Sequence, residues 1–177
     1  PDPNLGKELS TIRVGGHSKF NINYHIVWIP KYRKPMLGNP KLKKILEEIL
    51  RGQSESRGWN VIALEIMPDH IHLFLSVPPN TDVSKVVNQL KGNTSIQLRR
   101  IFPELKAKIK KHLWARGYYV STAGFISQEQ VQRYIDAQQK KLQEQRMRRK
   151  QGVKVEPQRT LAAIPPLPKG SGSLAVA

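Results

Sequence analysis

The segment from residue 59 to residue 77, WNVIALEIMPDHIHLFLSV, has the clearest structural pattern in this chain. Trp59 to Met67 and His70 to Val77 are both dominated by β-branched, aromatic and other apolar residues, which is typical of buried strands. Pro68 and Asp69, which separate the two runs, are common turn residues. We therefore predict two strands that pair as a β-hairpin.

A strand and a helix precede this hairpin. Residues 20–29, FNINYHIVWI, are rich in β-branched and aromatic residues, and Pro30 interrupts the pattern, so we predict a strand from Phe20 to Ile29. From Lys41 to Arg57, apolar residues recur at intervals of three and four, which indicates an amphipathic helix. Gly58 follows that helix and is suited to end it.

A second helix, a short strand and a last helix follow the hairpin. Thr81 or Asp82 is suited to cap a helix that runs to about Ile101. Gly117 to Thr122 is predicted to form a fourth strand, and Ser127 is predicted to cap a helix that reaches about residue 150. The order β-α-β-β-α-β with a final helix predicts an α+β fold. Its topology is the ferredoxin-like split β-α-β, an antiparallel sheet with helices on one face.

The distribution of charge divides the chain and indicates its partner. The 177 residues include 30 Lys and Arg against 13 Asp and Glu, a net charge of +17, which favours a nucleic acid or an anionic membrane surface. We expect a flexible arm over residues 1–17, a folded domain over 18–150 and a disordered, basic, Pro- and Gly-rich tail over 151–177.

Two function classes are excluded or disfavoured by composition. The chain has no cysteine, which excludes disulfides, zinc–thiolate sites and cysteine nucleophiles. No apolar run approaches the ~18 residues that a membrane span needs, so we expect a soluble, cytoplasmic protein with no membrane partner. A membrane-surface role is the weakest alternative, because the apolar stripe of the first helix is better explained by a core.

The pair His70 and His72 is the first candidate for chemistry. Side chains alternate along a strand, so both imidazoles lie on one face, ~7 Å apart, while Ile71 lies on the other. Two imidazoles so placed can bind one divalent cation, or they can be ordinary sheet histidines. Their apolar surroundings favour the metal site. We interpret His17, His25 and His112, scattered elsewhere, as structural.

Tyr134 and Gln138 are the second candidate. They are four residues apart on the last helix and therefore neighbours on one face. A tyrosine at such a position often only packs. Beside a metal-bound phosphate, however, its hydroxyl can act as a nucleophile that forms a covalent intermediate, and an amide oxygen such as that of Gln138 can bind the metal.

Several motifs together resemble one known family. Met67-Pro68-Asp69-His70-Ile71-His72-Leu73 is similar to the MPDHxH signature of the HUH single-tyrosine transposases, the TnpA-type enzymes of the smallest bacterial insertion sequences. The REP-associated tyrosine transposases, which are related to this family, share the same signature. Further matching segments, in order along residues 18–142, are Tyr24 to Pro35, Gln89 to Gly92, Leu113 to Val120, and Val131 to Gln138.

The resemblance implies a mechanism and a set of site residues. His70, His72 and Gln138 would bind Mg²⁺ or Mn²⁺, and Tyr134 would attack a phosphodiester of single-stranded DNA. The products would be a 5′-phosphotyrosine and a 3′-hydroxyl that later rejoins strands. Family members are homodimers that bind imperfect DNA hairpins at element ends, and the tyrosine helix of one subunit can complete the site of the other.

The remaining basic residues and the alternatives complete the sequence-based picture. We expect DNA contacts from Lys31, Arg33, Lys34, Lys91, Arg99 and Arg100. Lys106, Lys108, Lys110 and Lys111 form a basic run that we interpret as a loop, either a solvated face or a DNA contact.

The main alternative function is a catalytically silent DNA-hairpin-binding protein of the same fold. A relaxase or rolling-circle nickase would share the chemistry but would usually carry further domains.

Overall fold

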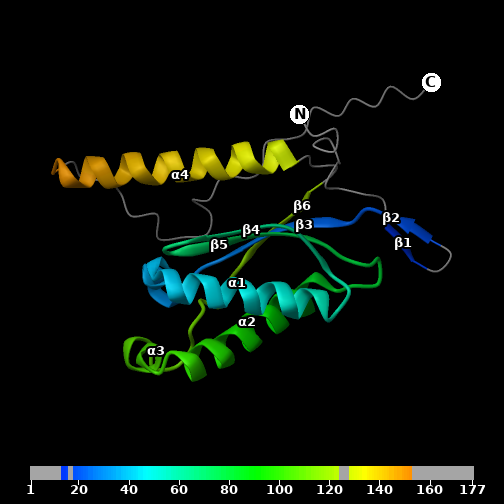
Figure 1. Ribbon diagram of the computed structural model, residues 1–177, viewed down its shortest axis with the longest axis horizontal. Coiled ribbons are helices and arrows are strands. Elements are labelled where there is room, and N and C mark those ends of the chain that lie inside the picture. Colours follow the sequence, from blue (N-terminus) through cyan, green and yellow to red (C-terminus); the bar gives the residue numbers. More distant parts are fainter. Residues whose placement is uncertain (1–12, 16–17, 124–127, 153–177) are drawn as a thin grey trace.

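The computed structural model of the protein describes residues 13–15, 18–123 and 128–152 (Figure 1). Its strands are β1 (Arg13–Gly15), β2 (Ser18–Phe20), β3 (Asn23–Trp28), β4 (Asn60–Met67), β5 (His70–Ser76) and β6 (Tyr119–Ala123). Its α-helices are α1 (Pro40–Glu55), α2 (Val83–Ile101), α3 (Glu104–Lys108) and α4 (Gln128–Lys150), and single 3-10 turns occur at Lys31–Arg33 and Met36–Gly38.

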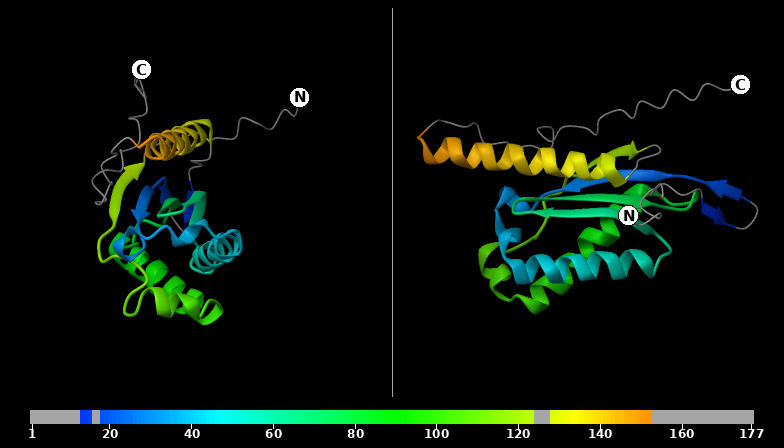
Figure 2. Two further views of the ribbon diagram at one scale, coloured as in Figure 1. Left: turned by 90° about the vertical axis from the view of Figure 1, so that its left-hand side faces the viewer. Right: turned by 45° about the horizontal axis from the view of Figure 1, so that its top comes forward.

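The principal sheet has four strands in the order β4-β5-β3-β6, and every neighbouring pair is antiparallel. Helices α1 and α2 cover one face of this sheet, and α4 crosses the opposite face (Figure 1, Figure 2). The predicted α+β fold with ferredoxin-like topology is confirmed, including the hairpin of β4 and β5. Among the described helices, none is long and apolar enough to cross a membrane.

The helix ends follow from their local sequence. Asn39 caps α1, because its side-chain oxygen accepts hydrogen bonds from the amides of Lys41 at 2.9 Å and Leu42 at 3.3 Å. Of the two expected caps of α2, Asp82 is the one used, and its carboxylate accepts from the Ser84 amide at 2.8 Å. Gly58 follows α1 with a φ of +68°, a conformation that favours glycine.

The main hydrophobic core lies between the sheet and the pair α1 and α2. The apolar stripe predicted for α1 is buried there through Leu42, Leu46 and Leu50. From the sheet, the alternate residues Ile71, Leu73 and Leu75 of β5 contribute to the same core. Burying each such leucine or isoleucine side chain stabilises the fold by roughly 1.5–3 kcal/mol.

The structure differs from the sequence-based expectations at β1 and at α3, and two further expectations fall on residues that it does not describe. Residues 13–15 form β1, which pairs with β2, inside the segment expected to be a flexible arm. Lys106 and Lys108 lie in α3 rather than in a loop, because Pro103 and Glu104 begin a short helix whose Leu105 is buried in the core. The predicted cap Ser127 and residues 153–177 of the expected tail lie outside the described residues.

Backbone and side-chain hydrogen bonds attach the segment before β6 to the rest of the fold. The Lys31 amide donates to the Leu113 carbonyl at 2.8 Å, and the Ala115 amide donates to the Ile29 carbonyl at 3.0 Å. The buried indole N–H of Trp114 donates to Oγ1 of Thr94 at 3.0 Å. These bonds bring two basic segments, the one after β3 and the one before β6, to the same end of the sheet.

We expect Thr94→Val to lower the free energy of unfolding by about 1–3 kcal/mol, because the Trp114 indole N–H would stay buried without an acceptor. Urea unfolding monitored by tryptophan fluorescence measures the change. Thr94→Ser, which keeps the hydroxyl acceptor, is the matched control and should lose less stability. Equal stability of Thr94→Val and the natural sequence would contradict this interpretation of the contact.

Candidate active site

The two histidines of the HIH motif lie on the face of the sheet that α4 covers. Because β5 is a regular strand, His70 and His72 share that face with Phe74, while Ile71 and Leu73 enter the core on the other. Both histidines are buried, and their rings are 4.9 Å apart between centroids at an interplanar angle of 77°. The predicted placement of the pair on one face is confirmed.

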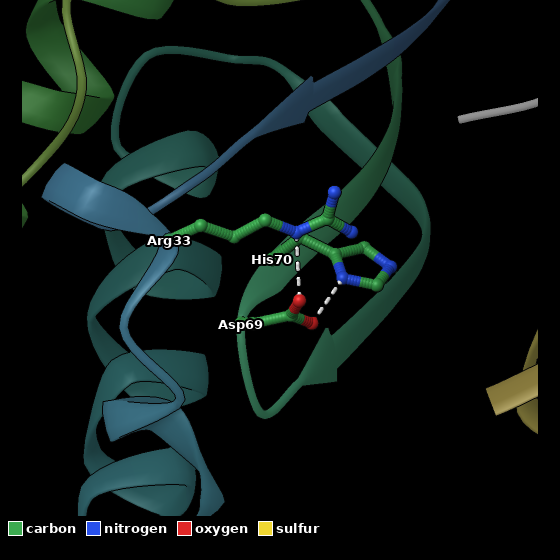
Figure 3. Close-up of polar contacts among 3 residues, drawn as sticks. All are labelled: Arg33, Asp69 and His70. Carbon is green, nitrogen blue, oxygen red and sulfur yellow. Dashed lines mark hydrogen bonds and ion pairs between the residues drawn. The ribbon is translucent and has the colours of Figure 1, made fainter. Parts of the chain in front are cut away.

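His70 is oriented by a chain of two ionic hydrogen bonds (Figure 3). Its Nδ1 lies 2.7 Å from Oδ1 of Asp69, and Oδ2 of Asp69 accepts from Nε of Arg33 at 2.7 Å. Burial opposes ionisation of Asp69, but the His70 and Arg33 contacts outweigh it and lower the pKa of the carboxyl to about 2. An ionised Asp69 only accepts, so the proton of this bond lies on Nδ1 of His70.

A strained turn brings Arg33 to Asp69. Tyr32 and Arg33 have φ values of 62° and 50°, in the left-handed region that non-glycine residues rarely adopt. Conformations of this kind cost of order 1–3 kcal/mol each and persist where surrounding contacts require them. Tyr32 itself is 75% exposed, with the Lys31 ammonium 5.0 Å from its ring centroid.

His72 is oriented by a third histidine, His25 of β3. Nε2 of His25 lies 3.0 Å from Nδ1 of His72, and both side chains are almost completely buried. Burial lowers the pKa of His25 from 6.5 to about 4. Burial, and then the neighbouring His70 and His25, lower the pKa of His72 to about 2. Both rings are therefore neutral at neutral pH and share a single proton in their hydrogen bond.

Tyr134 of α4 packs directly onto this histidine cluster. Its ring meets those of His25, His72 and Phe74 edge to face, with centroid distances of 5.4, 5.6 and 6.2 Å. Burial, with a smaller effect of Tyr119, raises the pKa of its hydroxyl to about 12. Gln138 lies one helical turn further along α4, and its side chain is outside the described part of the structure.

The histidine pair has the features of a metal site. Within the described residues, Nε2 of His70 and Nε2 of His72 are buried and have no hydrogen-bond partner. Since the Nδ1 of His70 is held by a carboxylate, its Nε2 is available as a ligand, an arrangement common around metal-binding histidines. The described side chains contain no group of three or more His, Cys, Asp and Glu residues that would hold an ion. An amide oxygen is a further type of ligand that could complete such a pair.

The basic residues expected to contact DNA fall into two groups. The first group, Lys31, Arg33 and Lys34, lies in the segment that follows β3. Arg33 is held by Asp69, and the Lys34 ammonium donates to the Lys108 carbonyl at 3.0 Å. The second group, Lys91, Arg99 and Arg100, belongs to α2 on the far side of the sheet.

Two of the three α2 residues are engaged within the protein. Lys91 donates to the carbonyls of Arg116 and Gly117 at 2.9 and 3.2 Å. Arg99 donates to the Ile109 carbonyl at 2.8 Å. Arg100 is exposed.

Sequence reasoning did not find the contact between His25 and His72. We interpreted His25 as a structural histidine, because nothing near it in the sequence marks it as part of a site. Its position on the same sheet face as His72 follows from the register of β3 on β5, in which His25 pairs with Phe74 and Val27 pairs with His72. Of the other two histidines interpreted as structural, His112 is exposed and His17 lies outside the described residues.

This chain is similar to several known transposases. Residues 18–138 match the family model described as "Transposase IS200 like". The transposase for insertion sequence element IS200 of Salmonella typhimurium is 37% identical over 123 residues, 69% of this chain and 80% of that protein. The ISDra2 transposase TnpA of Deinococcus radiodurans is 34% identical over 123 residues, 69% and 87% of the two chains. A solved Deinococcus radiodurans structure, described as that of a candidate transposase, has a TM-score of 0.60 and 32% identity, covering 72% of this chain and 98% of that one.

The buried histidines make stability depend on pH. Because the folded-state pKa values of His25 and His72 lie below 6.5, the unfolded chain binds protons first as the pH falls, and stability is lost from about pH 6.5 toward pH 4. For the metal-free protein we expect a loss of about 2 kcal/mol per histidine between pH 7 and pH 5. Urea unfolding at the two pH values in the presence of a chelator measures it.

The Asp69 carboxyl, with a pKa of about 2, does not titrate in this range. His112→Ala removes an exposed histidine and is the control, which should leave the pH dependence unchanged. An unfolding free energy that is the same at pH 7 and pH 5 would show that the two rings are not buried as neutral groups.

Proposed function

The chain belongs to the family of IS200-like transposases, and from that premise we propose that it cleaves and rejoins single-stranded DNA at the ends of an insertion sequence. The reaction proceeds through a 5′-phosphotyrosine formed on Tyr134. The observation that carries the proposal is the packing of Tyr134, 5.6 Å between ring centroids, onto His72 beside two unpartnered imidazole nitrogens. A nucleophile beside a metal-binding pair is the arrangement that phosphoryl transfer requires.

The histidines and Gln138 form the proposed metal site. Nε2 of His70, Nε2 of His72 and the amide oxygen of Gln138 would hold Mg²⁺ or Mn²⁺, in agreement with the unpartnered nitrogens of the pair. When bound, such a cation polarises the phosphoryl oxygens and stabilises the charge that develops on the leaving group. Asp69, which is held by Arg33, keeps the proton of His70 on Nδ1, so that the lone pair of Nε2 can bind a cation.

Tyr134 has to lose its proton during the attack. Because the pKa of its hydroxyl is about 12, the phenol is protonated at neutral pH before the reaction. As its oxygen bonds to the scissile phosphorus, the phenol proton is released to solvent and the bond from phosphorus to the 3′-oxygen breaks. The 3′-oxygen takes up a proton from solvent, so that no proton is gained or lost overall. A 3′-hydroxyl attacking a phosphotyrosine reverses these bond changes and rejoins DNA strands without an external energy source.

The DNA strand is proposed to enter over the basic end of the sheet. Lys31 and Lys34 lie there, and the Lys34–Lys108 hydrogen bond joins the segment after β3 to α3. Lys31 is half-buried and Lys34 is exposed, and ammonium groups at such a position attract phosphates and make binding strongly dependent on salt. Lys34 is exposed and can exchange its bond to the Lys108 carbonyl for one to a phosphate. We assign a positioning role to Arg33, Lys91 and Arg99, which are half-buried and donate to protein acceptors. The exposed Arg100 adds long-range attraction.

The proposed DNA substrate contains hairpins, and the proposed active form is a homodimer. The resemblance to the single-tyrosine transposases favours recognition of imperfect hairpins by a homodimer. Tyr134 packs on the histidine cluster of its own chain, and a dimer would allow α4 to be exchanged between subunits. A catalytically silent hairpin-binding protein remains the alternative, which the next experiment separates from a transposase.

We expect Tyr134→Phe to abolish covalent attachment to DNA, with cleavage reduced about 1,000-fold or more, while hairpin binding is retained. The substrate is single-stranded DNA that flanks the gene and contains a hairpin, incubated with Mg²⁺ or Mn²⁺. A denaturing protein gel shows the adduct as a shifted band. Tyr24→Phe removes a hydroxyl on the core side of β3 and is the matched control.

Equal cleavage by Tyr134→Phe and the natural sequence would contradict the assignment of the nucleophile. Tight hairpin binding without an adduct, for every flanking strand tested, would instead favour the silent binding protein.

We expect His70→Ala and His72→Ala to remove the response of cleavage to added Mg²⁺ or Mn²⁺, because each removes one proposed ligand. Binding of Mn²⁺, measured by isothermal titration calorimetry, should weaken in parallel. His112→Ala, which removes an exposed histidine away from the pair, should behave like the natural sequence. Unchanged metal dependence in both HIH variants would count against this site.

A further inference from the structure

The two proposed ligand histidines are held in the same way by different partners. In each ring Nδ1 is engaged, by Asp69 at 2.7 Å for His70 and by His25 at 3.0 Å for His72. In each ring, within the described part of the chain, Nε2 is buried without a partner. His25 therefore lies beside His72 as Asp69 lies beside His70, but a neutral imidazole can donate as well as accept.

The direction of the bond between His25 and His72 determines what His72 can do. If His25 donated from Nε2, the proton of neutral His72 would lie on its own Nε2, which then has no lone pair for a cation. If His72 donates from Nδ1, its Nε2 carries the lone pair, as in His70. Only the second direction makes both rings of the pair ligands. It places the proton of neutral His25 on its own Nδ1, which is buried without a partner among the described residues.

The surroundings of His25 hold its ring in place for this bond. The side chain is 0% exposed and stacks face to face on Phe74, with centroids 4.4 Å apart and an interplanar angle of 6°. The rings of Tyr119 and Tyr134 also contact the His25 ring edge to face, at 6.0 and 5.4 Å between centroids. Because β3 is bonded to β5 on one side and β6 on the other, its backbone cannot shift easily.

We propose that His25 is a positioning residue that accepts a hydrogen bond at Nε2 from Nδ1–H of His72 and so keeps the lone pair of His72 on Nε2. This inference rests on the proposed function, because only a metal site requires that lone pair. His25 therefore acts through His72 and touches neither the DNA nor the ion. Outer partners of this kind typically change metal affinity by about 10- to 100-fold when they are removed.

The test combines a spectroscopic measurement with metal binding. Long-range ¹H–¹⁵N correlation spectra of the metal-free protein show which nitrogen of His72 carries the proton. We expect Nδ1 in the natural sequence and a substantial Nε2–H population in His25→Phe, which preserves an aromatic ring on Phe74 but has no acceptor. Isothermal titration should show Mn²⁺ affinity about 10- to 100-fold lower in that variant.

Two further variants separate positioning from packing. His25→Gln restores an acceptor near the same position and should recover most of the Mn²⁺ affinity. Ile26→Val makes a small cavity on the core side of the same strand, and should leave both the His72 proton and the Mn²⁺ affinity unchanged.

Two results would overturn the inference. One is a proton on Nε2 of His72 in the natural sequence, a measurement that needs no variant to fold. The other is a His25→Phe protein that keeps both the Nδ1 proton and the Mn²⁺ affinity. If the natural protein bound no Mn²⁺ at all, the proposed function would fail, and the spectra would still decide which ring donates.

Discussion

The alternation of side chains along β5 is the constraint on which the rest of this structure depends. Ile71, Leu73 and Leu75 fill the core against α1 and α2, which leaves His70 and His72 on the face that α4 covers. A shift of register by one residue would exchange the two sets: the imidazoles would enter the core, and the apolar side chains would lie on the face that α4 covers. The packing that stabilises the fold thus also sets the geometry of the histidine pair.

The polar groups around that pair come from separate parts of the chain, and each has a distinct physical role. Asp69 lies in the hairpin turn and engages His70, and Arg33 neutralises Asp69 from the strained turn after β3. His25 engages His72 from within β3. Such outer contacts restrict the orientation of the two rings, so the entropy of ordering them is lost when the chain folds.

Charge is distributed unevenly between the site and its surroundings. The chain carries a net charge of +17, yet His25 and His72 at the centre of the site are neutral at neutral pH because burial lowers their pKa values to about 4 and about 2. Attraction of DNA therefore has to come from peripheral lysines and arginines. A neutral, buried centre suits metal binding, since a protonated imidazole has no lone pair to offer.

Local patterns in the sequence determined the hairpin, the amphipathic helix α1 and the placement of His70 and His72 on one face, because strand alternation and helical spacing involve residues close together in the chain. The motif around Asp69 also pointed to the family. Only the tertiary structure decided that His25 meets His72 across 47 positions and that Arg33 meets Asp69 across 36. It also decided that Tyr134 lies over the histidines. Those contacts depend on strand register and on which face α4 covers, and packing between distant segments sets both.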